Sequence, residues 1–183
     1  MNIITTPRLT LRTWRLDDAP AFHAMNQDPR VVEFLPGPMS MVQVEDFIAF
    51  QQALFARSRA CYFAVESDGE LAGFVGLKRH EADSPLPFAP CTDIGWRLAP
   101  AHWGKGIAGE AARACLAYGF DELGLEEIVS FTVPDNLRSR AVMEKLGMRE
   151  DAGGAFAHPA LAPEHRLSRH VLYRLRRGDA RAA

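Results

Sequence analysis

A glycine-rich segment of this chain reads Trp103-Gly104-Lys105-Gly106-Ile107-Ala108-Gly109. It follows a strand-like run that ends near Leu98, and it opens a long helical pattern. Glycines at such a transition let backbone N–H groups approach a ligand that side chains would block. The amino terminus of a helix adds unpaired N–H donors and the positive end of its dipole. The segment therefore predicts an anion site, of the kind that most often holds phosphate or pyrophosphate.

The same glycines could instead form a dinucleotide site or a P-loop, or serve only the packing of the fold. The spacing Gly104-x-Gly106-x-x-Gly109 matches the dinucleotide fingerprint, but residues 99–102 separate the strand from the helix. In a dinucleotide fold the turn joins the two directly, and further strand–helix units follow. A P-loop is excluded because Lys105 lies between two glycines and no Ser or Thr follows it. A purely structural role, in which the glycines allow close packing of helix and strand, stays open.

The composition indicates one globular domain without a strong charge bias. The chain has 183 residues, of which 48% are hydrophobic and 24% charged, and its net charge is −2. This length suits a single domain with a substantial core. The charge argues against sequence-independent binding to nucleic acid. The apolar runs are too short to cross a membrane, and residues 1–12 alternate rather than forming a secretory signal.

The cysteines suggest a compartment. Cys61, Cys91 and Cys115 are widely spaced and odd in number, and they include no Cys-x-x-Cys pair. This pattern predicts neither a disulfide framework nor a structural zinc site, and it favours a reducing environment. We therefore expect a cytoplasmic protein.

Six strands are expected, at residues 8–12, 61–65, 71–77, 93–98, 127–133 and 169–175. Polar and apolar residues alternate in the first, fourth and last of them, and residues 127–133 are rich in β-forming residues. The turn Ser67-Asp68-Gly69 predicts a hairpin between the second and third of them. The low-complexity tail after Gly178 is expected to fray, and the arginines at 174–181 are interpreted as part of a solvated tail.

Helical spacing and capping residues predict four helices. The first follows an acidic N-cap at 17–18 and ends at Asp28, because the next residue is proline. Ser40 and Gln43 have the spacing of a capping box at the start of the second. A long helix is expected over residues 104–123, with a stop at Gly124, and a shorter one follows the N-cap Asn136.

The resulting order of elements limits the fold class. A strand is followed by two helices, three strands, the long helix, a strand, a helix, a loop and a closing strand. This order predicts an α+β or mixed α/β fold, with a largely antiparallel first half and one βαβ crossover.

Four motifs in this order resemble one family, the GNAT superfamily of general-control-related N-acetyltransferases. Within it the chain resembles the branch of ribosomal-protein N-terminal acetyltransferases of the RimJ/RimL type. The glycine segment matches the family's Gln/Arg-x-x-Gly-x-Gly/Ala pattern, with Trp103 in place of Gln or Arg, as is usual in that branch. The other motifs are Thr6-Pro7-Arg8-Leu9-Thr10-Leu11-Arg12, Asp93-Ile94-Gly95-Trp96, and Asn136-Leu137-Arg138-Ser139 followed by Lys145-Leu146-Gly147.

The resemblance implies a fold and an activity. It implies a central mixed, mostly antiparallel sheet with flanking helices, in which the two neighbouring parallel strands at 93–98 and 128–133 splay apart. Residues 1–183 would form one N-acetyltransferase domain, with a flexible tail from about 178. The activity would be transfer of the acetyl group of acetyl-CoA to a primary amine by direct attack in a ternary complex, without a metal.

The same resemblance implies the residues that bind acetyl-CoA. The pyrophosphate would lie on N–H groups between Gly104 and Gly109, and Lys105 would add charge. The N–H of Leu98 would stabilise the thioester oxyanion. Asn136 would contact the pantetheine or cap its helix, and these two roles are compatible. The expected cofactor-binding set is Leu98, Trp103, Gly104, Lys105, Gly106, Ile107, Ala108, Gly109, Asn136 and Ser139.

The candidate catalytic residues are Asp93, Ser139 and Leu98. Asp93 occupies the place of a glutamate that is frequent in this branch, and it would act as general base, through water because it is shorter. Alternatively it only orders the start of its strand. Ser139 would protonate the leaving thiolate, since Met143 stands where many members carry a tyrosine. Cys115 is interpreted as buried packing rather than as a nucleophile.

The acceptor and the partners stay open at this point. The acceptor would be a protein N-terminus or a small-molecule amine, and the protein a monomer or a homodimer. The missing tyrosine leaves a non-catalytic acyl-CoA-binding sensor as the alternative. His158, His165 and His170 fit no standard zinc spacing and are interpreted as surface or substrate-side residues. Four apolar residues would line an acceptor pocket or pack in the fold, namely Phe34, Leu35, Phe88 and Trp96.

Overall fold

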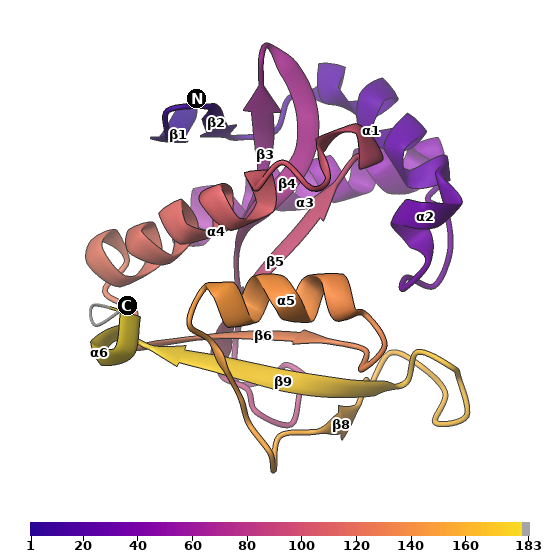
Figure 1. The fold of residues 1–183 in the computed structure, drawn as a ribbon. Coiled ribbons are helices and arrows are strands. Elements are labelled where there is room, and N and C mark those ends of the chain that lie inside the picture. The colour runs from indigo at the N-terminus through magenta and orange to yellow at the C-terminus, as the bar shows by residue number, and fades with distance from the viewer. Residues whose placement is uncertain (181–183) are drawn as a thin grey trace.

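One sheet forms the centre of the molecule, and helices lie on both of its faces (Figure 1). A computed structural model describes residues 1–180 of the chain. The strands are β1 (Asn2–Thr5), β2 (Leu9–Arg12), β3 (Tyr62–Ser67), β4 (Glu70–His80), β5 (Cys91–Leu98), β6 (Glu127–Thr132), β7 (Arg149–Glu150), β8 (Phe156–Ala157) and β9 (Arg169–Arg176). Their order is β1-β2-β3-β4-β5-β6-β9-β7, with β8 beside β9. Every neighbouring pair is antiparallel except β5 and β6, which confirms the mixed, mostly antiparallel sheet.

The helices form two layers. They are α1 (Ala19–Gln27), α2 (Pro29–Val32), α3 (Met41–Ser58), α4 (Ile107–Ala117), α5 (Leu137–Lys145) and α6 (Arg177–Ala180). On one face Ile94 of β5 lies in the same buried cluster as Ala111 of α4. On the other face Phe74 of β4 packs with Phe22 of α1 and Ile48 of α3. In Figure 1 α4 accordingly lies in front of the strands and α3 behind them.

The two central parallel strands diverge, as the family resemblance implies. Within the described residues β5 and β6 pair only at Asp93 and Val129. One residue further on, the Ser130 hydroxyl donates a hydrogen bond to the carbonyl of Ile94 (2.9 Å), where the backbone ladder stops. Figure 1 shows β5 rising steeply away from β6 beyond this point. The divergence leaves backbone groups of both strands without a strand partner.

Several local predictions are confirmed. The backbone N–H of Gln43 donates to the Ser40 hydroxyl (3.3 Å), and the Gln43 side chain accepts from the N–H of Ser40 (2.8 Å), so the capping box is present. Strands β3 and β4 form the predicted hairpin around Asp68 and Gly69, both of which have positive φ. Gly124 also has the left-handed φ (68°) expected of a residue that stops a helix.

The long helix predicted over 104–123 is wrong at both ends. Gly104 and Gly106 have φ values of 72° and 77°, so helical geometry begins only at Ile107. After Ala117 the α-helix gives way to a π-helical turn, Tyr118–Glu122. A continuous hydrophobic period does not distinguish these backbone forms, because the side-chain spacing changes little over one turn.

The predicted N-cap of the first helix is corrected in part. Asp18 occupies the N-cap position of α1, but its side chain makes no cap hydrogen bond. Its carboxylate accepts two hydrogen bonds from the Arg12 guanidinium (2.7 and 2.8 Å) and one from the N–H of Arg15 (2.8 Å). Asp18 therefore joins α1 to strand β2 through a buried ion pair.

The ends of the chain also differ from expectation. Strand β1 and the short strands β7 and β8 were not predicted. Residues 177–180, expected to fray from Gly178, form the short helix α6, and the Arg177 guanidinium donates to the carbonyl of Phe120. Arg174 is not part of a solvated tail, because it pairs from β9 with Glu127 (2.7 Å) and Asp151 (2.8 Å). Residues 181–183 of the predicted tail lie outside the described residues.

Candidate functional site

The glycine segment forms a turn that exposes the start of α4. Gly106 is the N-cap residue, and no side chain caps this helix. The first intrahelical hydrogen bond runs from the N–H of Glu110 to the carbonyl of Gly106 (3.0 Å). The N–H groups of residues 107–109 therefore precede the helical ladder, as first-turn donors do in any helix. A Cβ added at Gly104 would meet no atom within 4 Å, so the backbone there is open to a ligand.

The connection between β1 and β2, residues 6–8, braces this turn. The Arg8 guanidinium donates to the carbonyl of Lys105 (3.0 Å) and pairs with Glu110 in the first turn of α4 (2.6 Å). The Thr6 hydroxyl donates to the same carboxylate (2.6 Å), which together with Arg8 lowers the pKa of Glu110. In the sequence this opening motif indicates only the family. In the structure it also holds the glycine turn, a role that depends on contacts about 100 residues away in sequence.

The end of β5 forms one wall of the gap between the splayed strands. The N–H of Ala99 donates to Ala72 on β4 (2.9 Å). Because amide directions alternate along a strand, the N–H of Leu98 points to the opposite edge, toward β6. The carbonyl of Leu98 accepts the indole N–H of Trp103 (2.8 Å). The structure thus brings the predicted residues Leu98 and Trp103 together at this edge.

The start of α5 forms the other wall. The Asn136 side chain accepts from the N–H of Ser139 (3.2 Å), which confirms the predicted N-cap, and it donates to the Thr132 hydroxyl (3.0 Å). Arg138 stacks on the Trp103 ring at 4.4 Å, so α5 and the glycine turn meet across the gap. Met143 is buried in the core, so its side chain belongs to the packing of α5 against the sheet.

Asp93 lies at the narrow end of the gap and is not free. Its carboxylate is buried, and it accepts from the Tyr62 hydroxyl (2.9 and 3.0 Å) and from Nε2 of His80 (3.2 Å). Burial and the neighbouring Asp93 charge raise the pKa of Tyr62 well above its ordinary value. Sequence reasoning missed Tyr62 and His80, because they reach Asp93 only through the register of β3, β4 and β5.

Two histidines and three phenylalanine rings form a cluster between the β4–β5 loop and strands β6, β8 and β9. Phe131 contacts Phe88 and Phe156, with ring centroids 5.8 and 5.6 Å apart. His158 and His170 lie 5.0 Å apart beside these rings, and burial lowers the pKa of both imidazoles. His165 lies apart from this cluster and accepts from the N–H of Leu167 (3.1 Å).

The apolar residues predicted to line an acceptor pocket lie in different parts of the structure. Phe88 packs in the ring cluster, and Trp96 packs against the core beneath α4. Phe34 lines a hollow of about 340 Å³ together with residues 133–135 at the start of the β6–α5 loop and residues 166, 167 and 169. Leu35, Phe88 and Trp96 are not among the residues that line this hollow.

The thiols are not in a reactive setting. Cys115 is fully buried in α4, and burial raises its pKa far above the ordinary value. Burial likewise raises the pKa of Cys61 to about 12 and that of Cys91 to about 11. A thiol attacks as the thiolate, so these groups are poor nucleophiles at neutral pH. Over residues 1–180 there is no group of three or more His, Cys, Asp or Glu that could hold a metal ion.

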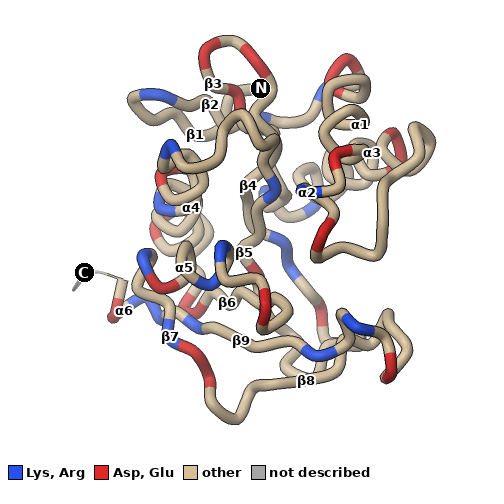
Figure 2. The backbone as a smooth tube through the Cα atoms, turned by 45° about the vertical axis from the view of Figure 1, so that its right-hand side comes forward, with Lys and Arg blue, Asp and Glu red and all other residues tan. Residues whose placement is uncertain are grey.

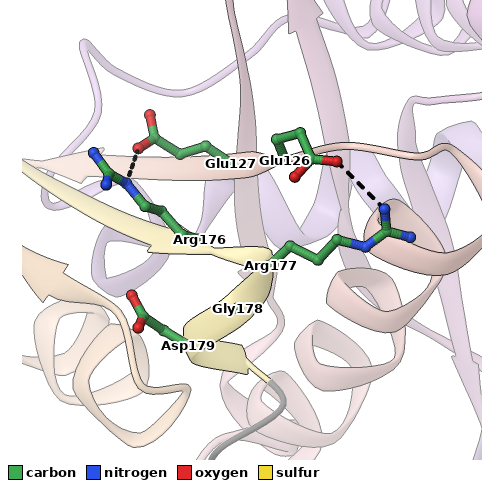
Figure 3. Close-up of a pocket in the computed structure, with 6 residues that line it drawn as sticks. All are labelled: Glu126, Glu127, Arg176, Arg177, Gly178 and Asp179. Carbon is green, nitrogen blue, oxygen red and sulfur yellow. Dashed lines mark hydrogen bonds and ion pairs between the residues drawn. The ribbon is translucent and has the colours of Figure 1, made fainter.

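Charge is distributed without a single dominant face. Figure 2 shows Lys and Arg interspersed with Asp and Glu over most of the backbone. A second hollow, of about 430 Å³, lies at the opposite end of β6 from the gap (Figure 3). Its arginines are paired, Arg176 with Glu127 and Arg177 with Glu126. Among the helices of residues 1–180, none is long and apolar enough to cross a bilayer.

Comparisons with known proteins agree with this arrangement. The uncharacterized N-acetyltransferase YnaD of Bacillus subtilis (strain 168) is 30% identical over 149 residues, which cover 81% of this chain and 83% of that protein. The FsC-acetyl coenzyme A-N(2)-transacetylase of Aspergillus fumigatus is 30% identical over 151 residues, 76% of this chain and 64% of that protein. In fold, the chain resembles the RimL ribosomal L7/L12 alpha-N-protein acetyltransferase solved with coenzyme A, with a TM-score of 0.80 at 19% identity, covering 98% and 99% of the two chains.

The family of this chain is shown by a family model that matches most of its sequence. The Acetyltransferase (GNAT) domain family matches residues 8–149, from the arginine that braces the glycine turn to the first residue of β7. The matched region contains the splayed strands, the glycine turn and the start of α5. The chain therefore belongs to the GNAT acetyltransferase family.

Proposed function

We propose that this protein transfers the acetyl group of acetyl-CoA to a primary amine by direct attack within a ternary complex. The observation that carries the proposal is the parallel pair β5 and β6, which opens beside the uncapped start of α4. The gap offers backbone edges to an extended molecule, and the helix start offers donors to its phosphates. Membership of the GNAT family supports acetyl transfer, and the Aspergillus relative is named for acetyl coenzyme A.

The free donors fit the chemistry of coenzyme A. The pyrophosphate would accept from N–H groups between Gly104 and Gly109, with Ile107 and Ala108 in the first turn and Lys105 beside it. Leu98 and Trp103 would flank the pantetheine on the β5 side. Asn136 and Ser139 would flank it on the α5 side.

The chain's own residues then account for each proton. When bound, acetyl-CoA supplies an activated acyl carbon; the amine nitrogen bonds to this carbon, and the carbon–sulfur bond breaks. The N–H of Leu98 stabilises the oxyanion that forms between these events. The Asp93 carboxylate takes the proton of the amine through a water, held in place by Tyr62 and His80. The Ser139 hydroxyl gives a proton to the leaving thiolate and regains one from water, Asp93 returns its proton to water, and no metal takes part.

The acceptor class is a protein N-terminus or a small-molecule amine. An α-amine has a pKa of about 8, against about 10.4 for lysine. At neutral pH a larger fraction of an α-amine is therefore already in the neutral form that attacks the thioester. We expect the protein to act in the cytoplasm, as a monomer or a homodimer. A buried methionine at 143 favours one competing function, a sensor that binds acyl-CoA without transferring the acyl group.

The test measures release of free CoA thiol with peptides, polyamines and aminoglycosides as acceptors. We expect release that depends on both acetyl-CoA and one class of amine. A Gly106→Val variant should lose it, because a branched side chain is strained at a φ of 77° beside the expected phosphate site. Gly178→Ala is the matched control, since its Cβ meets nothing within 4 Å. Binding of acetyl-CoA with no turnover of any amine would favour the sensor, and no binding at millimolar acetyl-CoA would overturn both.

A further inference from the structure

Arg97 differs from the other buried and half-buried arginines of the described residues. Among residues 1–180 these arginines are Arg12, Arg97, Arg140, Arg174 and Arg177. Four of them form an ion pair with a carboxylate, namely Arg12, Arg140, Arg174 and Arg177. Arg97 forms none with a carboxylate of the described residues. Arg97 is only half-buried, and its nitrogens are not among the buried unpartnered atoms of the described residues, so a ligand carboxylate can reach this unpaired charge.

The surroundings of Arg97 fix the orientation of its guanidinium. Nη1 donates to Oδ1 of Asn26 (2.5 Å) and contacts Sδ of Met39 (3.5 Å). Asn26 is fully buried, and its Nδ2 donates to the carbonyl of Phe22 (2.7 Å), which fixes the amide so that its oxygen faces Arg97. The guanidinium carbon Cζ lies over the Phe74 ring, 5.4 Å from its centre.

One edge of the guanidinium is left without a partner. Within the described residues Nε and Nη2 make no hydrogen bond, although both carry N–H donors. These two nitrogens lie on one edge and can bind a carboxylate through two parallel hydrogen bonds. Burial lowers the pKa of Arg97 to about 10, so the group is still a cation at neutral pH.

This edge lies on the acceptor side of the proposed reaction. Residues 93, 95 and 97 share one face of β5, because side chains alternate along a strand. The start of α4 and its glycine turn are on the opposite face, where Ile94 and Leu98 pack. The phosphates expected at the glycine turn are therefore on the other side of the sheet from Arg97.

The aromatic rings of Tyr62 and Phe74 lie between Arg97 and Asp93. A Cβ added at Gly95, between them, would lie 3.2 Å from atoms of the Tyr62 ring. That ring stacks on Phe74 at 5.0 Å, and its hydroxyl reaches Asp93. A cation and an anion thus flank one flat apolar surface, an arrangement complementary to a molecule that carries both an amine and an acid.

We propose that Arg97 binds a carboxylate of the acceptor, so that the acceptor is an amino acid or another amine that also carries a carboxylic acid. This inference rests on the proposed acetyl transfer. The carboxylate accepts from Nε and Nη2 of Arg97, the apolar part lies on Tyr62, and the amine is directed toward Asp93. Arg97 acts on specificity and takes no part in the proton transfers.

The test compares acceptors that differ only in this carboxylate. The probes are standard amino acids against their α-amides, and short peptides with glutamate against glutamine at the second position. These two series distinguish a free amino acid from an acidic peptide as the source of the carboxylate. We expect the wild-type protein to prefer the acid of the favoured series by about 10-fold to 100-fold in kcat/KM, the range for hydrogen bonds to a charged group.

Variants assign this preference to Arg97. Arg97→Gln should abolish it, and Arg97→Lys should retain only part, because lysine keeps the charge but lacks the two-nitrogen edge. Arg57→Gln, an exposed arginine in the last turn of α3, is the matched control. Acetyl-CoA binding, measured by calorimetry, should be the same in all four proteins.

The outcomes separate the two proposals. If wild-type protein does not bind acetyl-CoA, the proposed function itself is wrong. If it binds acetyl-CoA but acetylates amides as well as acids, or acetylates no carboxylated amine, the role of Arg97 is overturned. A preference for acids that persists in Arg97→Gln would overturn it as well.

Discussion

At the scale of single residues, Asp93 is defined by its two neighbours. The Tyr62 hydroxyl and the His80 ring both donate to its carboxylate, which holds it in one orientation at the narrow end of the gap. We predict that Asp93→Asn lowers kcat by about 10²-fold to 10⁴-fold, the usual contribution of a general base. The Kd of acetyl-CoA should not change, because the cofactor residues are elsewhere.

Steady-state kinetics and calorimetry on the same preparation check this prediction. Asp17→Asn is the control, since Asp17 is exposed on the turn before α1. Tyr62→Phe should cost less than Asp93→Asn, because it removes one hydrogen bond and keeps the carboxylate. An Asp93→Asn protein with wild-type kcat would show that Asp93 only orders its strand.

Residue roles could be predicted where the relevant contact is local in sequence. Asn136 could be predicted as an N-cap because it directly precedes the helical pattern and asparagine is a preferred capping residue. The structure confirms it, since the Asn136 side chain accepts from the N–H of Ser139. Tyr62, His80 and Arg97 could not be found this way. Their positions depend on which residues of β3, β4 and β5 lie opposite one another, and a one-residue change of register would move every side chain to the other face.

At the scale of elements, the turn before α4 is the part whose conformation matters most. Gly106 has a φ of 77° and caps the helix with its backbone alone. We predict that Gly106→Ala costs about 1–2 kcal/mol of unfolding free energy, the penalty for a Cβ in the left-handed region. It should also weaken acetyl-CoA binding, because relaxing the strain moves the N–H groups that follow.

Chemical denaturation and titration with acetyl-CoA measure the two effects. Gly178→Ala again serves as the control, because that position has open space and no positive φ. Equal stability and equal affinity for Gly106→Ala and wild type would contradict a role for this conformation.

The elements themselves were predictable in kind and less so in extent. The strands of six or more residues, β3, β4, β5, β6 and β9, are long enough for their composition, alternation or flanking turns to indicate them. Strands β7 and β8 have two residues each, which is too short for any period to appear. The predicted start of α4 was early because a hydrophobic period does not report the sign of φ at Gly104 and Gly106.

At the scale of the whole molecule, the half-buried imidazoles of His158 and His170 make stability depend on pH. Burial lowers the pKa of His158 and His170 below the ordinary value of 6.5, so the folded protein favours their neutral forms. The unfolded chain then binds more protons in the window between the lowered values and 6.5. We predict that the free energy of unfolding is greatest above this window and falls as the pH drops through it.

Urea denaturation across the range from pH 8 to about pH 5 measures the slope. A protein with both His158→Phe and His170→Phe should show a shallower slope over this range. Gly178→Ala, outside the ring cluster and without a change in any titratable group, should leave the slope as it is. A slope that is unchanged in the double variant would contradict the burial of these imidazoles as its cause.

The fold as a whole was predictable because its motifs and its order of elements agree. Strand, helix and crossover follow one another as a mixed sheet requires, and four family motifs occur along that order. The two layers and the splay could be expected from the resemblance alone. Strand β1, which pairs with the neighbouring β2, and helix α6 could not be expected in this way. Helix α6 depends on a contact of Arg177 with the carbonyl of Phe120, which is distant in sequence.

The central claim is that the open strand pair and the glycine turn bind acetyl-CoA for transfer to an amine. Calorimetric titration of the wild-type protein with acetyl-CoA, and separately with NADH, tests it most directly. We predict saturable binding of acetyl-CoA at a concentration between about 1 μM and 1 mM, the usual range for enzyme substrates, and no binding of NADH. Binding of NADH with no binding of acetyl-CoA at millimolar concentration would contradict the claim.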